Sequence, residues 1–372
     1  MTITEVNTRA TRKAFLDTAR LIYKHDSNWI CPLDNDIEAV FDPSKNIFFE
    51  FGKAIRWILT NENGELIGRV AAFINEKKAY NYEQPTGGMG FFECIDNNQA
   101  ANLLFDTAKA WLQMNGMEAM DGPINFGEND MFWGLLIEGF VPQSYGMNYN
   151  HPYYKKFFND YGFKTQYEQI TNHISAHQPF PERFTKIAGW VAQKPGYSFK
   201  HLKTSHIELF AADFMEVYND AWSGFENFVP IQKATIYETF RKMKAIMDEN
   251  LIWFAYVDNE PAAFVVVLPD ANQMIKTLNG KLDIIGKMKF LYYRWKGVHR
   301  MRAIVMGTKT KYQKHGLESV LFIKLKEYVL PLKQYDEMEL SWVGDFNEKM
   351  IALHEAMGGV FGKKHATMRC MF

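Results

Sequence analysis

The sequence predicts a protein of two domains in which strands and helices alternate, an α/β or mixed α+β fold. Its 372 residues exceed the usual size of a single hydrophobic core. Strand-type and helix-type patterns alternate through both halves. The order strand, glycine turn, helix, strand, helix occurs once in each half, which predicts a diverged duplication. We expect domains at 1–178 and 201–372, joined by a proline-containing connection at 179–200.

Composition excludes several classes of protein. Hydrophobic residues make up 47% and charged residues 23%, which is ordinary for a folded protein. The formal net charge is −1, so no nucleic-acid partner is expected. Cys31, Cys94 and Cys370 lie far apart, which argues against a disulfide framework and a metal site. The sequence has neither an apolar leader nor a run of 18 apolar residues, so we expect a cytoplasmic protein.

In the first half, the elements follow from alternation and from helix-end signals. The Asn63-Gly64 pair predicts a hairpin turn, and the glycine-rich stretch 86–90 predicts a joint before the third strand. Asn97 is placed to cap a helix that Gly116 ends. The expected elements are strands at 54–61, 66–75 and 91–95 and a helix at 98–115.

In the second half, the same signals recur around a basic insertion. Apolar runs rich in β-branched and aromatic residues predict strands, and apolar residues at helical spacing predict helices. The expected strands are 206–210, 251–257, 262–268, 302–308 and 337–343. The expected helices are 211–222, 231–249, 317–330 and 348–357.

The segment from Val305 to Leu317 carries the clearest chemical signal. An apolar strand runs through a basic loop directly into a helix, whose first backbone N–H groups have no partner within the helix. A diphosphate bound there would accept several of these hydrogen bonds, and Gly316 would leave room for it. A glycine at such a turn is, however, more often only a turn. Three lysines add charge attraction: Lys309, Lys311 and Lys314.

Two segments together resemble the GNAT superfamily of acyl-CoA N-acyltransferases. Gln313-Lys314-His315-Gly316-Leu317-Glu318 is similar to its cofactor motif, Gln/Arg-x-x-Gly-x-Gly/Ala, and the later segment 347–358 resembles its closing motif through Asn347, Met350, Leu353, His354 and Gly358. The resemblance implies two tandem GNAT-like domains, each a mixed central sheet flanked by helices. It implies acetyl-CoA or a longer acyl-CoA as cosubstrate and no metal. The implied cofactor-binding residues are Val305, Met306, Gly307, Thr308, Gln313, Lys314, His315, Gly316, Leu317 and Asn347.

Two positions depart from the family pattern. Glu318 stands where the family has glycine or alanine, so the site stays open only if this side chain points outward along the helix. His354 replaces the tyrosine that protonates the departing CoA thiolate in many relatives. Histidine can supply a proton at neutral pH, but a helix histidine with no role is equally consistent with the sequence.

The first half resembles the same fold without its chemistry. The turn before the helix at 98–115 has no Gln/Arg-x-x-Gly motif, and Phe158 stands at the proton-donor position. Because phenylalanine cannot donate a proton, we interpret 1–178 as a degenerate GNAT-like domain.

The resemblance also implies an acceptor. The strings FFECIDN, DGPIN and SWV are similar to tandem GNAT proteins of bacteria, including or close to proposed ceramide synthases, which implies a small-molecule or lipid amine acceptor such as a sphingoid-type amine. Asp220 and Glu226 lie in or near the loop that borders the amine in this superfamily, so either is a candidate to accept its proton. With no cysteine placed as a nucleophile, direct transfer is expected.

Residues 276–302 form a strongly basic insertion. Its lysines and arginines outnumber its single acid, Asp283, by 8 − 1 = 7 charges. Residues 284–302 would form an amphipathic helix, and two interpretations follow. The apolar stripe packs on its own domain, which we prefer, or it contacts the inner membrane peripherally. The stripe is Ile284, Met288, Leu291, Trp295 and Val298.

Two other functions stay open. A catalytically inactive tandem GNAT-fold protein that serves as a binding surface or scaffold would explain Glu318 and the missing motif in the first half. An aminoacyl-tRNA-dependent transferase would use the basic insertion, although the net charge of −1 argues against it. The oligomeric state is not predicted.

Overall fold

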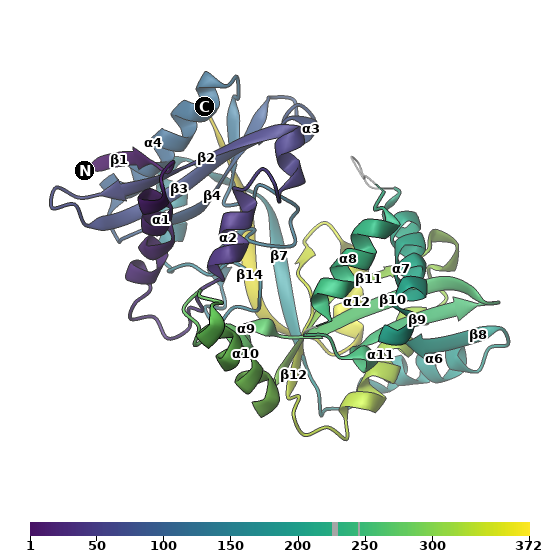
Figure 1. Cartoon of the computed structure of the whole chain (residues 1–372). Coiled ribbons are helices and arrows are strands. Elements are labelled where there is room, and N and C mark those ends of the chain that lie inside the picture. The colour runs from purple at the N-terminus through teal and green to yellow at the C-terminus, as the bar shows by residue number, and fades with distance from the viewer. Residues whose placement is uncertain (225–229, 245) are drawn as a thin grey trace.

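The computed structural model describes residues 1–224, 230–244 and 246–372 and has two lobes, each built on a mixed sheet (Figure 1). The first lobe contains β1 (Thr2–Glu5), α1 (Arg9–Ile22), α2 (Asp34–Val40), β2 (Gly52–Thr60), β3 (Leu66–Asn75), α3 (Glu76–Ala79), β4 (Thr86–Cys94), α4 (Asn98–Met114), β5 (Ala119–Gly122), β6 (Leu135–Glu138) and α5 (Tyr154–Tyr161). The second lobe contains α6 (Glu182–Ala192), β8 (Tyr197–His201), α7 (Ile207–Trp222), α8 (Lys233–Met243), β9 (Ile252–Val257), β10 (Glu260–Pro269), α9 (Ala271–Ile275), α10 (Ile284–Lys296), β11 (Arg300–Thr308), α11 (Leu317–Val329), β12 (Glu337–Glu339), β13 (Val343–Gly344) and α12 (Glu348–Ala356).

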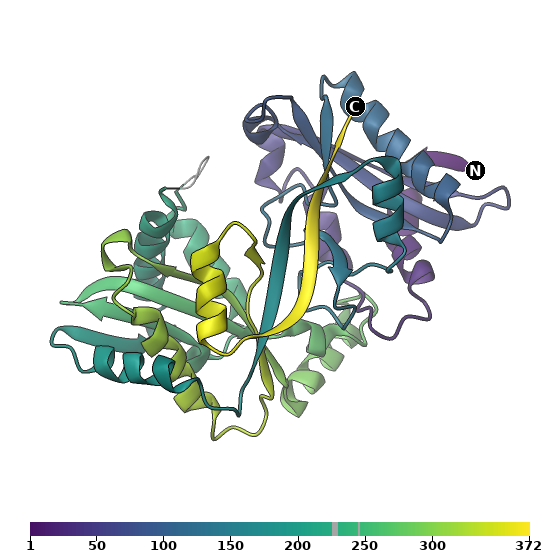
Figure 2. The same cartoon turned by 180° about the vertical axis from the view of Figure 1, so that it is seen from behind.

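Two long strands, β7 (Lys164–Ser175) and β14 (Val360–Met371), join the lobes. They are antiparallel partners and lie side by side between the lobes (Figure 2). The sheet order is β1-β2-β3-β4-β5-β14-β7-β12-β11-β10-β9-β8. The last strand of the chain therefore completes the sheet of the first lobe. The domain boundary at 179–200 stays a prediction.

Helices cover the sheet with apolar faces, which gives each lobe its own core. In the first lobe, α4 buries Leu104, Phe105 and Leu112 completely, as its helical spacing of apolar residues predicts. In the second lobe, α6 and α11 cover one face of the sheet, and α7 and α8 cover the other. β9 and β10 are consequently buried on both faces.

The basic insertion connects the two lobes. Ile275 and Leu278 of the second lobe pack with Ile30 and Leu33 of the first. The amide of Asp34 donates a hydrogen bond to the Gly280 carbonyl at 2.8 Å. The stretch between α9 and α10 thus forms part of the contact between the lobes.

Two predicted elements are wrong. Residues 206–210, predicted as a strand, belong to a 3-10 turn and the start of α7, in which Phe210, Phe214 and Val217 are buried on the sheet at helical spacing. The predicted joint at 86–90 is instead the first part of β4. Its glycines serve close packing, since a β-carbon on Gly88 would lie 2.1 Å from the Phe73 ring.

Within the described residues, none of the helices combines the length and the apolar character needed to cross a membrane.

Candidate functional site

In the second lobe, β11 and β12 diverge after a short stretch of pairing. They run parallel only where Arg300–Arg302 face Glu337–Glu339. The chain beyond β12 then forms β13, which pairs with β7 instead, while β11 continues along β10 as far as Thr308. Among the described strands, none pairs with the far side of β11 from Ala303 onward.

A β-bulge lies in β11 at the point where the strands diverge. Val305 faces Val266 and Ala303 faces Val267, so Ile304 is an extra residue on β11. Ile304 is 36% exposed in a strand whose neighbours are largely buried. A bulge bends its strand and changes the direction of the groups that follow it. Here it directs the last part of β11 away from β12.

The turn from β11 to α11 needs glycine for its backbone. Gly316 is the residue before α11, with φ 76°, and no side chain caps the first turn of this helix. A β-carbon on Gly316 would also lie 3.2 Å from both Ile187 and Val191 of α6. Gly316 therefore permits both the left-handed backbone and the contact between this turn and α6.

The predicted basic residues of the turn are paired with carboxylates. Lys309 is buried and forms ion pairs with Glu216 and, at 2.8 Å, with Glu260. Lys311 pairs with the other oxygen of Glu260 at 2.7 Å. Hydrogen bonds from Lys309 and Lys311 lower the pKa of Glu260 to about 2. Because both charges are already balanced, neither lysine adds net positive charge for a phosphate group.

Two further carboxylates lie at the turn. Asp220, at the end of α7, accepts a hydrogen bond from the Thr310 amide at 2.6 Å. Glu318 accepts a hydrogen bond from the Thr308 hydroxyl at 2.7 Å. The outward orientation of Glu318 that an open site requires is therefore not observed. A diphosphate at this turn has to displace the Glu318 carboxylate or bind beside it.

Four of the predicted cofactor-binding residues form the end of β11. Val305 and Met306 are half-buried, and Gly307 and Thr308 are buried. The ring of Trp222 covers Gly307, because a β-carbon there would lie 2.7 Å from that ring. Trp222 itself stacks on Tyr218 at 4.2 Å between ring centroids, so α7 forms one wall beside this strand end.

The loop residues have different environments. Gln313 and Lys314 are exposed, and Lys314 has φ 68°. The ring nitrogen Nδ1 of His315 lies 2.7 Å from the Tyr197 hydroxyl. Leu317 is fully buried in the core under α11. Of these four side chains, those of Gln313 and Lys314 lie on the surface of the turn, while His315 and Leu317 hold it in place.

The remaining predicted residues lie on or near α12 or outside the described residues. The Asn347 side chain accepts from the Met350 amide and caps α12. His354 is 4% exposed, its Nδ1 lies 3.4 Å from the Asn172 amide nitrogen, and burial lowers its pKa to about 4. Its ring is therefore neutral at pH 7, which argues against the acid role. Glu226 lies outside the described residues.

No motif in the sequence indicates the buried charge cluster that lies at the point of divergence. Glu339 is fully buried and pairs with Lys363 at 2.5 Å and with Arg302 at 3.5 Å. Burial alone would raise the pKa of Glu339, but the charges of Lys363 and Arg302 lower it to about 2. His173 lies 3.9 Å from the same carboxylate, and burial lowers the pKa of nearby His365 to about 4. The cluster joins β7, β11, β12 and β14, strands far apart in the sequence.

The first lobe repeats the outline around β4. β4 pairs with β5 only over Thr86–Gly88, and a bulge follows at Phe91, whose φ is 49°. The end of this strand is occupied by side chains of the same lobe. The Tyr154 hydroxyl accepts from the Cys94 amide at 2.8 Å, and the Tyr153 hydroxyl donates to the Cys94 carbonyl at 2.9 Å.

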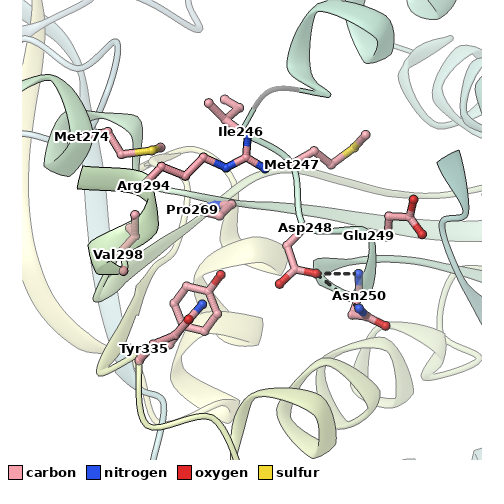
Figure 3. A pocket seen from close by; sticks show the side chains of 12 residues that line it. Ile246, Met247, Asp248, Glu249, Asn250, Pro269, Met274, Arg294, Val298 and Tyr335 are labelled. Carbon is pink, nitrogen blue, oxygen red and sulfur yellow. Dashed lines mark hydrogen bonds between the residues drawn. The ribbon is translucent and has the colours of Figure 1, made fainter. Parts of the chain in front are cut away.

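A cavity of about 380 Å³ lies at the opposite ends of β10 and β11 from the turn. Met274 and Val298 lie on one side of it, and Asp248 and Asn250 lie on the other (Figure 3). Arg294 and Gly297 at the end of α10 complete this part of its wall. Its lining mixes polar and apolar groups, and it is separate from the β11–α11 turn.

Comparisons with known proteins agree with this architecture. No protein-family model matches the sequence. The chain is 28% identical over 382 residues to the bacterial ceramide synthase of Caulobacter vibrioides (strain NA1000 / CB15N), covering 98% of this chain and 96% of that protein. It is 27% identical to Protein YghO of Escherichia coli (strain K12), covering 93% and 89%.

Solved structures share the fold at low identity. A tandem GNAT protein from the clavulanic acid biosynthesis pathway has a TM-score of 0.58 at 12% identity and covers 100% of this chain and 98% of its own. A GCN5-related N-acetyltransferase from Sphaerobacter thermophilus has a TM-score of 0.54 at 10% identity, covering 99% and 95%. The predicted fold class is confirmed: the protein has the tandem GNAT fold.

Proposed function

We propose that the protein is an N-acyltransferase that moves an acyl group from acyl-CoA to a primary amine. The observation that carries the proposal is the divergence of β11 from β12 at the Ile304 bulge, which leaves one side of the strand end without a strand partner. Backbone groups at such an edge can hydrogen-bond the pantetheine arm and polarise a thioester carbonyl. The tandem GNAT fold and the name of the Caulobacter relative support the same reaction class.

The transfer is direct in this proposal. The neutral amine attacks the thioester carbonyl, a C–N bond forms, and the C–S bond breaks, so that sulfur leaves as the CoA thiolate. One proton passes from the amine nitrogen to water or a carboxylate, and one proton reaches the thiolate. With a pKa of about 4, His354 holds no spare proton at pH 7, so water is the better-supported donor.

The acceptor in this proposal is a long-chain or sphingoid-type amine. Support comes from the name of one relative, because a ceramide synthase acylates the amine of a sphingoid base. We place amine recognition at the wall formed by α7, where Tyr218 and Trp222 lie beside the end of β11. Asp220 is committed to the Thr310 amide, so a role as base would require it to leave that hydrogen bond.

A second function, a non-catalytic binding protein, is favoured by one observation. Glu318 and the paired lysines leave the turn without net positive charge for a diphosphate. A tandem GNAT-fold protein that no longer binds CoA needs no positive charge at this turn.

Calorimetry with CoA and acyl-CoA separates the two functions. The enzyme proposal expects saturable binding, and about fivefold tighter binding for Glu318→Gln, because a negative charge near the phosphates is removed. Glu327→Gln is the matched control, since Glu327 lies on the same helix and pairs with Lys324 on the surface. Absence of binding by both wild type and Glu318→Gln would support the non-catalytic protein. Mass spectrometry of an acyl-CoA and sphingoid-amine mixture would then detect the amide product of an active enzyme.

A further inference from the structure

Helix α10 exposes an apolar face that no described part of the chain covers. The preferred interpretation from sequence, in which this face packs on its own domain, is wrong for all but Val298, which is buried. The helix is held from its opposite side, where Phe290 and Tyr293 pack with residues of both lobes. The exposed side chains are Ile284 (79%), Ile285 (65%), Met288 (67%), Leu291 (60%), Tyr292 (54%) and Trp295 (82%).

Basic residues flank this face. At 3.6 residues per turn, the six exposed apolar positions fall on one side of the helix. Lys289 and Lys296 then lie along one border of that side, and Lys287 lies along the other. Lys276 and Lys281 are exposed just before the helix. The one acid at this end, Asp283, accepts a hydrogen bond from the Gly286 amide and caps the helix.

We propose that α10 is a docking helix for an anionic lipid bilayer. Isoleucine, leucine and tryptophan side chains on the outer face would enter the boundary between headgroups and acyl chains, while the flanking lysines would contact anionic headgroups. The charge pattern selects a negatively charged surface as the partner. The inference stands apart from the proposed reaction, because it requires neither CoA nor turnover.

Docking by this face also determines what lies near the bilayer. α10 sits at the edge of the molecule beside the junction of the lobes (Figure 1). Its C-terminal end, at Arg294 and Gly297, forms part of the wall of the 380 Å³ cavity. A bilayer under α10 would therefore lie close to that cavity.

Vesicle co-sedimentation of the full chain tests the proposal. Wild type should bind vesicles of phosphatidylcholine with 30% phosphatidylglycerol, bind vesicles of phosphatidylcholine alone much less, and release as salt rises. Reversing the charges in Lys287→Glu/Lys289→Glu/Lys296→Glu should weaken binding by at least about fivefold per residue. Trp295→Ser should weaken it about tenfold through lost insertion.

Trp190→Ser is the matched control, because Trp190 is also an exposed helix tryptophan, 67% exposed, on α6. It should bind vesicles like wild type, and far-ultraviolet circular dichroism should show every variant folded. The proposal is overturned by failure of folded wild type to bind anionic vesicles, or by equal losses for Trp190→Ser and Trp295→Ser. Sedimentation velocity gives a third test: a dimer that only Trp295→Ser dissociates would assign the face to a second copy of the chain instead.

Discussion

The two lobes contain the same strand arrangement but differ at the end of one strand, β4 in the first lobe and β11 in the second. β4 and β11 each pair briefly with a parallel neighbour, carry a bulge and lead into a helix. In the first lobe, Tyr153 and Tyr154 hydrogen-bond both backbone groups of Cys94 at the strand end. In the second lobe, the stretch after Ile304 pairs with β10 on one side, and among the described residues its other side meets neither a strand nor such a pair of hydroxyls.

The helices that follow these two strands also differ, because only α4 has a side-chain cap at its start. α4 is capped by the Asn97 side chain, which accepts from the Ala100 amide, so one amide of its first turn has a partner within the lobe. α11 begins at Gly316 without a side-chain cap. Unpaired amides are what an anionic or thioester ligand can use. The difference supports the second lobe as the one that binds a ligand and the first as a structural half.

Removing Lys363 should have the largest effect. Lys363→Met leaves Glu339 buried with Arg302 as its remaining close ion-pair partner, and breaking a buried pair costs about 3–5 kcal/mol. Denaturant unfolding measures the loss. The neighbouring Lys364→Met is the control, since Lys364 pairs with Glu138 and Glu168 near the surface and should cost no more than about 1 kcal/mol. Equal losses would contradict a special role for the buried cluster.

Replacing His354 by phenylalanine, the residue found at 158 in the first lobe, tests whether the imidazole is held neutral. His354 and Phe158 are both buried, and both stand where the resemblance to GNAT proteins implies a proton donor. The pKa of His354 in the folded protein, about 4, lies below its ordinary 6.5. The stability linked to this group is therefore complete above about pH 6.5 and is lost as pH falls toward 4, by about 1–3 kcal/mol.

His354→Phe should flatten that fall in stability between pH 6.5 and 4, measured by urea unfolding at several pH values. His25→Gln, at an exposed histidine, should leave the profile unchanged. Identical profiles for wild type and His354→Phe would show that the imidazole is not held neutral. A loss of turnover in His354→Phe at pH 7, with acyl-CoA affinity unchanged, would restore His354 as the acid.

Removing a hydroxyl at the strand end of the first lobe should lower the free energy of unfolding without changing CoA affinity. Tyr154→Phe removes the hydroxyl that accepts from the Cys94 amide and donates to Glu93, leaving buried polar groups unpaired at about 1–3 kcal/mol. CoA affinity should not change. A loss of CoA affinity in this variant, with the fold retained, would assign ligand binding to the first lobe and reverse the comparison.

The smallest effect is expected at the turn before α11. Gly316→Ala forces a β-carbon into a left-handed conformation next to Ile187 and Val191, which costs about 1–2 kcal/mol in thermal unfolding. Gly189→Ala on α6 should be neutral or stabilising, because its β-carbon would meet no atom within 4 Å. If Gly316→Ala is as stable as wild type, the turn differs from that described.

Local periodicity predicted the β2–β3 hairpin and α4 of the first lobe and the main elements of the second, but not α1, α5, β7 or β14. Alternation located β2 and β3, a continuous apolar run located β10, and helical spacing located α4, α7 and α11, because each element buries one face or both faces against a core. The strand predicted at 206–210 is wrong because five residues are too few to distinguish the alternation of a strand from the spacing of a helix. The placement of β14 between β5 and β7 depends on pairing over the whole chain, which no local pattern records.

The sequence predicted the strand-to-helix turn at 305–317 but not the side chains that surround it. The structure contains this turn, and its role as a cofactor site stays a prediction. The carboxylates that balance its lysines come from α7 and β10, so sequence spacing does not bring them to the turn. The same holds for Glu339 and Lys363, which meet only because β12 and β14 both lie next to β7.

Hydrogen–deuterium exchange with and without acyl-CoA tests the difference between the lobes most directly. Slower exchange is expected at Ile304–Thr308 and over the first turn of α11 on ligand addition, with no change at Phe91–Asn97. Protection at Phe91–Asn97 instead, or at neither strand end under saturating acyl-CoA, would contradict the assignment of the ligand to the second lobe.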